Sequence, residues 1–165
     1  MNDFRILIRN TDTDEKKWYV CPLNEEQIAN ELNIPITDES GIDYDHYIID
    51  EIETPYSVPR CQILDDVSNE YDIYCQLPQF LQDNIGPIME ELDCIQDVLE
   101  VYKNDGIDFY PDYKSKYDYI RYIIEVYRSV PTDMLDYIDY DKYLTDFEYN
   151  SSIIESKDGI IVIRF

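Results

Sequence analysis

The sequence predicts an α+β protein, with strands near both ends of the chain and helices between them. Three observations predict this class. Apolar residues alternate with polar ones near the N-terminus, recur every three or four residues through the middle, and form two short runs around an Asp-Gly pair near the C-terminus. We therefore expect three small modules, at residues 1–60, 61–103 and 104–165.

Three strands are expected in the first module. Phe4, Ile6 and Ile8 occupy alternate positions, which is typical of a strand that packs one face against a core. A second apolar run spans residues 18–21, and a third spans residues 47–52. Together these runs indicate a three-stranded sheet.

One helix and one loop are expected between these strands. Asn24 precedes residues 25–33, and its side chain is placed to cap a short helix there. Pro35 and Gly41 favour a loop over residues 34–47. The apolar residues of the helix that would face inward are Ile28, Ala29 and Leu32.

Helical periodicity begins at Cys61 and defines the second module. Pro78 suits the first turn of a further short helix, which is expected to end near Gly86. The apolar residues of the helix after Cys61 recur at intervals of three and four and are Ile63, Leu64, Val67, Tyr71 and Tyr74.

A longer helix is expected to begin at Pro87. Glu90, Asp93, Asp97 and Glu100 lie beside its apolar side, so this helix should present an acidic ridge to solvent. Like charges at this spacing repel by about a few tenths of a kcal/mol per pair, and a sequence selected for stability alone would place lysines among them. Its apolar side repeats through Ile88, Leu92, Ile95, Leu99 and Tyr102.

The third module is expected to combine helices with a terminal hairpin. Residues 104–112 form a connector, and Ser115 can cap a helix that runs to about Arg128. Two short helices follow within residues 130–149, and the Asp-Gly pair at Asp158 favours a tight β-turn. The apolar residues expected to turn inward are Tyr117, Ile120, Ile124, Tyr127, Met134, Leu135, Ile138 and Leu144.

The charge balance restricts the partners of the protein. The chain carries 37 acidic and 13 basic residues, for a net charge of −24. Its 44% hydrophobic content, with 17 tyrosines, indicates a folded core and not a disordered polyanion. Nucleic acids and anionic membranes both require a basic surface, which this sequence lacks. The expected partner is a basic surface of another protein.

Cysteine usage and targeting signals indicate the compartment. The four cysteines have no CxxC spacing, and we expect buried, reduced thiols. Neither a signal peptide nor an apolar run of transmembrane length is recognisable, so we expect a cytoplasmic protein. The cysteines are Cys21, Cys61, Cys75 and Cys94.

Catalytic patterns are weak throughout the sequence. His46 is the sole histidine and lies in a polar segment, so nucleophilic pairs that need a histidine depend on it alone. Oxygen-rich stretches at residues 12–15 and 43–45 do not continue into an EF-hand pattern, and the cysteines are too scattered for zinc. No phosphate-binding glycine loop is present. We expect no enzyme activity, no cofactor and no metal site.

The size of the charge suggests mimicry of DNA. Duplex DNA carries one negative charge per about 1.7 Å of axis, so a net charge of −24 matches about 41 Å of duplex. A compact globule of this length has a radius of gyration of about 15 Å, so an elongated chain would imitate the duplex better. The acids expected to form the contact surface are Asp65, Asp66, Glu70, Asp72, Glu90, Glu91, Asp93, Asp97, Glu100, Asp133, Asp136, Asp139, Asp141 and Asp146.

The sequence resembles the ArdA antirestriction proteins, which are DNA mimics encoded on conjugative plasmids, transposons and phages. The resemblance spans nearly the whole chain and is strongest toward the C-terminus. A weaker similarity covers residues 52–58. The residues that carry it are Val130, Pro131, Leu135, Tyr137, Ile138, Asp139, Tyr140, Tyr143, Asp146, Gly159 and Ile160.

This resemblance implies a function, a shape and an oligomeric state. It implies an elongated chain of three modules that forms a homodimer through the C-terminal module. It also implies inhibition of type I restriction–modification enzymes by occupation of their DNA-binding groove, which protects incoming mobile-element DNA. The resemblance implies no cofactor.

Two other functions remain open from the sequence. The protein can be a DNA mimic aimed at another basic enzyme, such as a CRISPR effector, which would serve the same mobile element. Alternatively, it can be an acidic structural or interaction module whose carboxylates keep it soluble, as in halophilic proteins. Capture of restriction subunits, CRISPR proteins or neither from a host lysate would separate these three possibilities.

Overall fold

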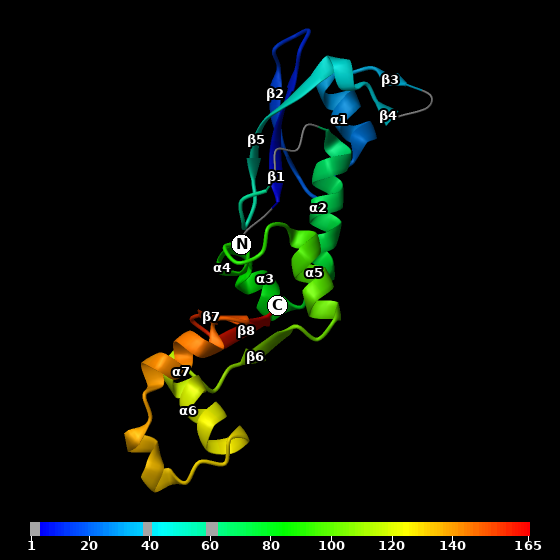
Figure 1. Ribbon diagram of the computed structural model, residues 1–165. Coiled ribbons are helices and arrows are strands. Elements are labelled where there is room, and N and C mark those ends of the chain that lie inside the picture. Colours follow the sequence, from blue (N-terminus) through cyan, green and yellow to red (C-terminus); the bar gives the residue numbers. More distant parts are fainter. Residues whose placement is uncertain (1–3, 38–40, 59–62) are drawn as a thin grey trace. The chain divides into compact units, whose positions relative to one another are not determined.

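The computed structural model describes residues 4–37, 41–58 and 63–165 and confirms the α+β class (Figure 1). The chain forms two compact units, the N-terminal unit (Met1–Met89) and the C-terminal unit (Glu90–Phe165). The division into three modules and the elongated arrangement stay predictions. Among the described residues, every helix is too short or too polar to cross a membrane.

An antiparallel sheet with the strand order β2-β1-β5 forms the N-terminal unit's framework, as predicted. Its strands are β1 (Arg5–Asn10), β2 (Lys16–Val20) and β5 (Tyr47–Glu53). Ile6 and Ile8 are fully buried, which confirms the packed face expected from their alternation. Figure 1 shows these strands side by side in blue and cyan.

Helix α1 (Glu25–Leu32) forms where the capping signal predicted it. The backbone amide of Gln27 donates to the side-chain oxygen of Asn24 at 2.9 Å, which satisfies a donor that the first helical turn leaves free. The helix ends at Asn33, whose left-handed φ of 53° is a conformation that asparagine tolerates well. Its inward residues Ile28, Ala29 and Leu32 are buried.

The predicted loop over residues 34–47 contains more structure than expected. Strands β3 (Ile36–Thr37) and β4 (Gly41–Ile42) pair antiparallel, and η1 (Tyr44–His46) is one turn of 3-10 helix. The carboxylate of Glu25 accepts the backbone amide of Ile42 at 3.2 Å, and the Ile42 side chain is buried. This burial fixes a segment whose proline and glycine content indicates only a loop.

Helix α2 (Leu64–Gln76) confirms the helical periodicity after Cys61, a residue that lies outside the described ranges. Ile63 precedes the helix and has no polar side chain to cap it. The hydroxyl of Tyr47 accepts the backbone amide of Leu64 at 3.1 Å instead. Burial raises the pKa of Tyr47 to about 12, so this hydroxyl stays protonated in neutral solution.

The prediction of a long helix that begins at Pro87 is wrong. Helices α3 (Gln79–Asp83) and α4 (Ile85–Ile88) are short, and residues 89–94 form turns and bends. Helix α5 (Ile95–Lys103) begins only after them. Gly86 therefore lies inside α4 and does not end the preceding helix.

The break separates the acids of the predicted ridge into two sets. A continuous helix would align Glu90 and Asp93 with the acids that follow, and like charges at that spacing repel. In the structure, Glu90 and Asp93 lie in the turns and bends, while Asp97 and Glu100 remain on α5. Asp97 occupies the first turn of α5, where the helix dipole stabilises a carboxylate.

A second antiparallel sheet, with the order β6-β8-β7, organises the C-terminal unit. The terminal hairpin of β7 (Ser151–Glu155) and β8 (Ile160–Arg164) is confirmed. The predicted connector is wrong in part, because Ile107–Tyr110 forms β6 and pairs with β8. Residues 160–163 of β8 are all buried, so this strand needs a neighbour on each edge.

Gly159 closes the hairpin turn at a position that no other residue fits. Its φ is +155°, in a region that side chains disfavour. A Cβ atom at Gly159 would lie 2.5 Å from the backbone oxygen of Tyr110. The backbone of the turn thus packs directly against the end of β6.

The helix predicted from Ser115 forms as α6 (Lys116–Tyr122), and the Ser115 hydroxyl accepts the amide of Asp118 at 3.1 Å. It continues as one π-helical turn, η2 (Ile123–Tyr127). The wider π turn changes the orientation of the residues from Ile123 to Tyr127. The predicted inward stripe is wrong at its ends: Tyr117 and Tyr127 are exposed, and the residues that are buried are Tyr119, Ile120 and Ile124.

Two short helices follow as predicted, η3 (Thr132–Tyr137) and α7 (Tyr140–Phe147). Leu135 is buried in the core of the unit, and Ile138 and Leu144 pack against that core. The prediction that Met134 turns inward is wrong, because its side chain is 52% exposed. The core cluster consists of Tyr119, Ile120, Ile124, Leu135, Ile153, Ile160 and Val162.

The described cysteines are free thiols, but they are not uniformly buried. Cys21 is buried, and this burial raises its pKa to about 11. Cys94 is partly buried and Cys75 is exposed, so the expectation of burial is wrong for Cys75. Cys75 lies in the last turn of α2.

Candidate acidic interface

Each of the predicted contact acids lies in the described part of the chain, and none is buried. Glu70 and Asp97 are partly buried, and the other acids of the set are exposed. They fall into three groups: the acids of α2 in the N-terminal unit, those of residues 90–100, and those of residues 133–146 in the C-terminal unit. Exposure is what contact with a partner requires, so the whole set remains a candidate interface.

Helix α2 carries acidic residues and no basic ones. Asp65 and Asp66 occupy its first turn, where the helix dipole favours negative charge. Asp66 and Glu70 lie one turn apart, and Asp65 and Asp72 lie two turns apart. The helix therefore holds four carboxylates at spacings fixed by its backbone.

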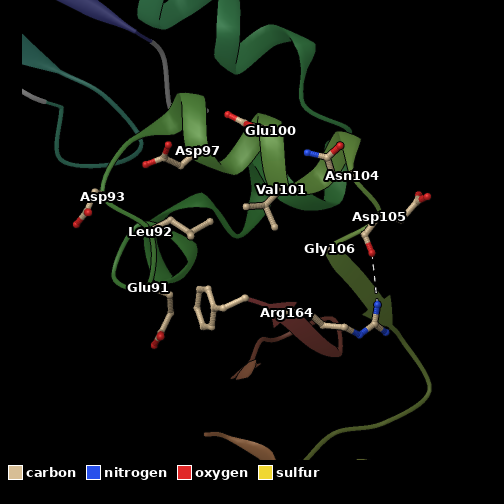
Figure 2. A pocket seen from close by; sticks show the side chains of 11 residues that line it. Glu91, Leu92, Asp93, Asp97, Glu100, Val101, Asn104, Asp105, Gly106 and Arg164 are labelled. Atoms are coloured by element: carbon tan, nitrogen blue, oxygen red, sulfur yellow. Dashed lines mark hydrogen bonds between the residues drawn. The ribbon is translucent and has the colours of Figure 1, made fainter. Parts of the chain in front are cut away.

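The second group surrounds a pocket in the C-terminal unit. Glu91 and Asp93 come from the bends before α5, and Asp97 and Glu100 come from α5 itself (Figure 2). The pocket has a volume of about 760 Å³. Its lining also includes Leu92, Val101, Asn104, Asp105, Gly106, Arg164 and Phe165.

The third group lies on η3 and α7. Asp133 and Asp136 belong to η3, and both side chains are exposed. Asp139 caps α7 by accepting the backbone amide of Lys142 at 3.0 Å. Its position is thus set by the start of the helix. The remaining acids of this group are Asp141 and Asp146.

The basic residues of the N-terminal sheet pair with other acids. Arg9 Nε lies 3.1 Å from Asp50 and Lys16 Nζ lies 2.6 Å from it. The hydrogen bond from Lys16, together with that from Arg9, lowers the pKa of Asp50. Lys17 pairs with Glu31 at 3.0 Å. These cations therefore balance carboxylates of the sheet and of α1.

Three basic residues of the C-terminal unit, Lys116, Lys157 and Arg164, also pair with acids outside the predicted contact set. Lys116 Nζ lies 2.6 Å from Glu148, and Arg164 pairs with Asp108. Asp66 aside, no acid of the predicted contact set takes part in an ion pair within the described residues.

Tyrosine hydroxyls hold several of these acids in place. Tyr56 donates to Glu70 at 2.9 Å, and in the C-terminal unit Tyr117 donates to Asp141. This hydrogen bond raises the pKa of Tyr117. A phenol is neutral, so it restrains a carboxylate without cancelling its charge.

A third pair has the same form and a longer bond. Tyr44 donates to Asp65 at 3.4 Å, and burial, followed by the charge of Asp65, raises the pKa of Tyr44. The sequence pattern alone does not predict these tyrosine–carboxylate pairs. The signal that could have found them is the abundance of tyrosine, at 17 residues, in a chain with 37 acids.

The ring of His46 lies between two carboxylates. Its Nδ1 lies 2.6 Å from Asp12 Oδ2, and its Nε2 lies 3.7 Å from Asp43 Oδ2. The hydrogen bond between His46 and Asp12 raises the pKa of His46, and it ties the turn between β1 and β2 to η1. Both ring nitrogens face carboxylates, an arrangement that favours an ion-paired ring over a general base.

The oxygen-rich stretches at residues 12–15 and 43–45 each place one carboxylate, Asp12 and Asp43, beside the ring of His46. Within the described ranges, no group of three or more histidine, cysteine, aspartate or glutamate side chains is arranged to hold a metal ion. Comparisons with protein-family models and with curated proteins found no match. The features of the molecule that bear on its function are therefore the charge, exposure and fixation of its acidic side chains.

Proposed function

We propose that the protein is a DNA mimic that occupies the basic DNA-binding groove of type I restriction–modification enzymes. The observation that carries this proposal is the presence of exposed carboxylates that are held by helices and tyrosine hydroxyls, away from the ion pairs of the sheet. By occupying the groove, the protein protects incoming mobile-element DNA from cleavage. The proposed site of action is the cytoplasm, and the proposed assembly is a homodimer, as the family resemblance implies.

Fixed, uncompensated carboxylates are what such a groove requires. A DNA-binding groove is lined by lysine and arginine that neutralise phosphates at regular positions along the duplex. A carboxylate already paired with a lysine would attract such a groove weakly. Complementary charge also accelerates the encounter between inhibitor and enzyme, and this acceleration diminishes as salt screens the charges.

A cleavage-protection assay tests this proposal. Increasing amounts of the protein are mixed with a purified type I restriction enzyme before its target DNA and ATP are added. We expect cleavage to fall as the protein concentration rises, and the inhibition to weaken as the salt concentration rises. Undiminished cleavage by a panel of type I enzymes at saturating protein would contradict the proposal.

The same protein, used as bait in a host lysate, distinguishes the related functions. Capture of restriction subunits supports the proposal. Capture of a CRISPR effector, with loss of that effector's DNA binding, would reassign the mimic to a different target. Capture of a partner that binds no nucleic acid would indicate an acidic interaction module and would contradict mimicry.

A further inference from the structure

The pocket of the C-terminal unit combines two surfaces that a uniformly charged face lacks. Leu92 and Val101 point into the hollow, and carboxylates lie at its edge (Figure 2). Phe165 also lines the pocket, and its side chain is 70% exposed. An exposed aromatic ring beside a hollow offers apolar surface whose exposure to water is unfavourable.

The walls of this pocket are joined by backbone hydrogen bonds. The amide of Gly106 donates to the Val101 carbonyl at 2.8 Å, and the amide of Arg164 donates to the Gly106 carbonyl at 2.8 Å. A Cβ atom at Gly106 would lie 2.6 Å from Val101 Cγ1 and 3.5 Å from the backbone oxygen of Arg164, so Gly106 lies close to both the end of α5 and the end of β8. The hollow is therefore a preformed feature of the unit.

The charges around the pocket are unbalanced. Arg164 is the basic residue of the lining, and its guanidinium already pairs with Asp108 and donates to the Asp105 carbonyl at 3.4 Å. Within the described residues, the ion pairs leave the remaining lining acids uncompensated. These acids are Glu91, Asp93, Asp97, Glu100 and Asp105.

We propose that this pocket receives an arginine side chain from the DNA-binding groove of the partner enzyme, an inference that rests on the proposed function. The charge of the rim selects a cation. The exposed ring of Phe165 selects arginine over lysine, because a planar guanidinium stacks on aromatic faces and is more weakly hydrated than an ammonium. The apolar floor accommodates the methylene stem.

This arrangement makes the pocket a binding hot spot within a broader charged surface. Arginine residues that enter well-packed, partly desolvated sites dominate many interfaces, whereas contacts at an exposed rim contribute little. Asp97 is partly buried, so its bond to a guanidinium is less screened than bonds of the exposed acids on η3.

The probe for this pocket is N-acetyl-arginine amide, titrated into the full-length protein while backbone amide signals are followed by NMR. We expect saturable shifts that centre on Leu92, Val101, Gly106 and Phe165. N-acetyl-citrulline amide has nearly the same shape and no charge, and it should cause no saturable shift. Equal shifts with both probes would overturn the proposal.

Two matched double variants test which acidic residues bind the arginine probe. The double variant Asp93→Asn, Asp97→Asn should weaken arginine binding by about tenfold, the loss of about one charge-assisted hydrogen bond. The double variant Asp133→Asn, Asp136→Asn removes the same charge from η3 and should leave binding within about twofold. Equal weakening by the two variants would show that net charge alone attracts the probe, and would overturn the proposal. Phe165→Ala tests the aromatic contact without changing the charge.

These results are separable from those of the cleavage assay. Localised arginine binding by a protein that inhibits no restriction enzyme would contradict the proposed function, and with it the assignment of the arginine to that enzyme's groove. Cleavage protection without localised arginine binding would overturn the proposal that the pocket binds arginine, but it would not contradict the proposed function. Both proposals are supported if arginine binding is localised to the pocket and if Asp93→Asn, Asp97→Asn reduces inhibition more than Asp133→Asn, Asp136→Asn does.

Discussion

The hydroxyl of Tyr117 donates to Asp141, a carboxylate of the predicted contact set. Replacing this tyrosine by phenylalanine keeps the ring and the net charge but frees the carboxylate. We expect Tyr117→Phe to weaken inhibition in the cleavage assay by about twofold to fivefold, because a restrained exposed charge contributes about 0.5–1 kcal/mol.

Tyr137→Phe is the control for this prediction. Tyr137 is 84% exposed, and its hydroxyl makes no hydrogen bond within the described residues. This substitution should leave inhibition unchanged. Equal effects of the two substitutions would show that fixation by tyrosine does not contribute to binding.

The environment of His46 gives a prediction for pH. Its hydrogen bond to Asp12 raises its pKa above the ordinary value of 6.5. A raised folded-state pKa contributes stability that is fully present below pH 6.5 and is lost as the pH rises through the folded pKa. We expect an NMR titration of the single histidine ring to give a pKa above 6.5, and Asp12→Asn to lower it toward that value.

Asp14→Asn is the matched variant for this titration. Asp14 lies in the same turn but pairs with Arg9, at 3.2 Å, and not with His46. It should leave the histidine pKa nearly unchanged. An unshifted histidine in the unmodified protein, or equal changes in the two variants, would contradict the role assigned to Asp12.

The stability of the protein should be sensitive to the residue at Gly159, in the turn between β7 and β8, and much less sensitive to the residue at Gly86 in α4. Gly159→Ala places a Cβ atom against the rigid backbone of Tyr110 in an unfavourable region of φ. We expect it to lower the free energy of unfolding by at least about 2 kcal/mol. Gly86→Ala should change it by less than about 1 kcal/mol, since the nearest atom, the Pro55 oxygen, is 3.9 Å from the added Cβ.

Urea unfolding followed by circular dichroism measures both substitutions. A Gly159→Ala variant as stable as the unmodified protein would contradict the close approach of the turn to β6. A strongly destabilised Gly86→Ala variant would contradict the open surroundings of α4.

Elements with complete local signals are predictable from the sequence. Helix α1 has a capping asparagine, a periodic face and a residue that tolerates the left-handed conformation at its end, and all three agree with the structure. The terminal hairpin has an Asp-Gly turn between apolar runs, and it also agrees. In both cases the residues that determine the element are neighbours in the sequence.

Other elements depend on distant partners, which the sequence does not identify. Strand β6 (Ile107–Tyr110) forms because β8 lacks a second neighbour without it. The break before α5 is not visible in the local pattern, because the apolar repeat through Leu92 favours a continuous helix. The pocket follows from this break, so it could not be predicted from a continuous acidic ridge.

Inhibition by the whole protein should depend on many acidic side chains and not on one of them. Outside the pocket, neutralising one exposed acid that no tyrosine hydroxyl restrains, as in Asp72→Asn, should change inhibition by less than about twofold. Reversing Glu90, Asp93, Asp97 and Glu100 to lysine should abolish inhibition, because it reverses the local charge and fills the pocket rim with cations. Circular dichroism verifies that the reversed variant remains folded.

A single neutralisation on α2 or η3 that abolished inhibition with the fold intact would contradict this distribution. It would locate the activity at one residue outside the pocket. Unchanged inhibition by the charge-reversed variant would contradict the role of the residue 90–100 segment as a contact surface.

Competition with DNA for a type I restriction enzyme tests mimicry most directly. A fluorescent duplex that carries the recognition sequence is bound to the enzyme, and the unlabelled protein is titrated into the complex while anisotropy is followed. We predict complete displacement of the duplex, with an apparent affinity that falls as salt is raised because the charged surfaces are screened. Formation of a ternary complex, in which enzyme, duplex and protein are bound together without mutual effect, would contradict mimicry of DNA.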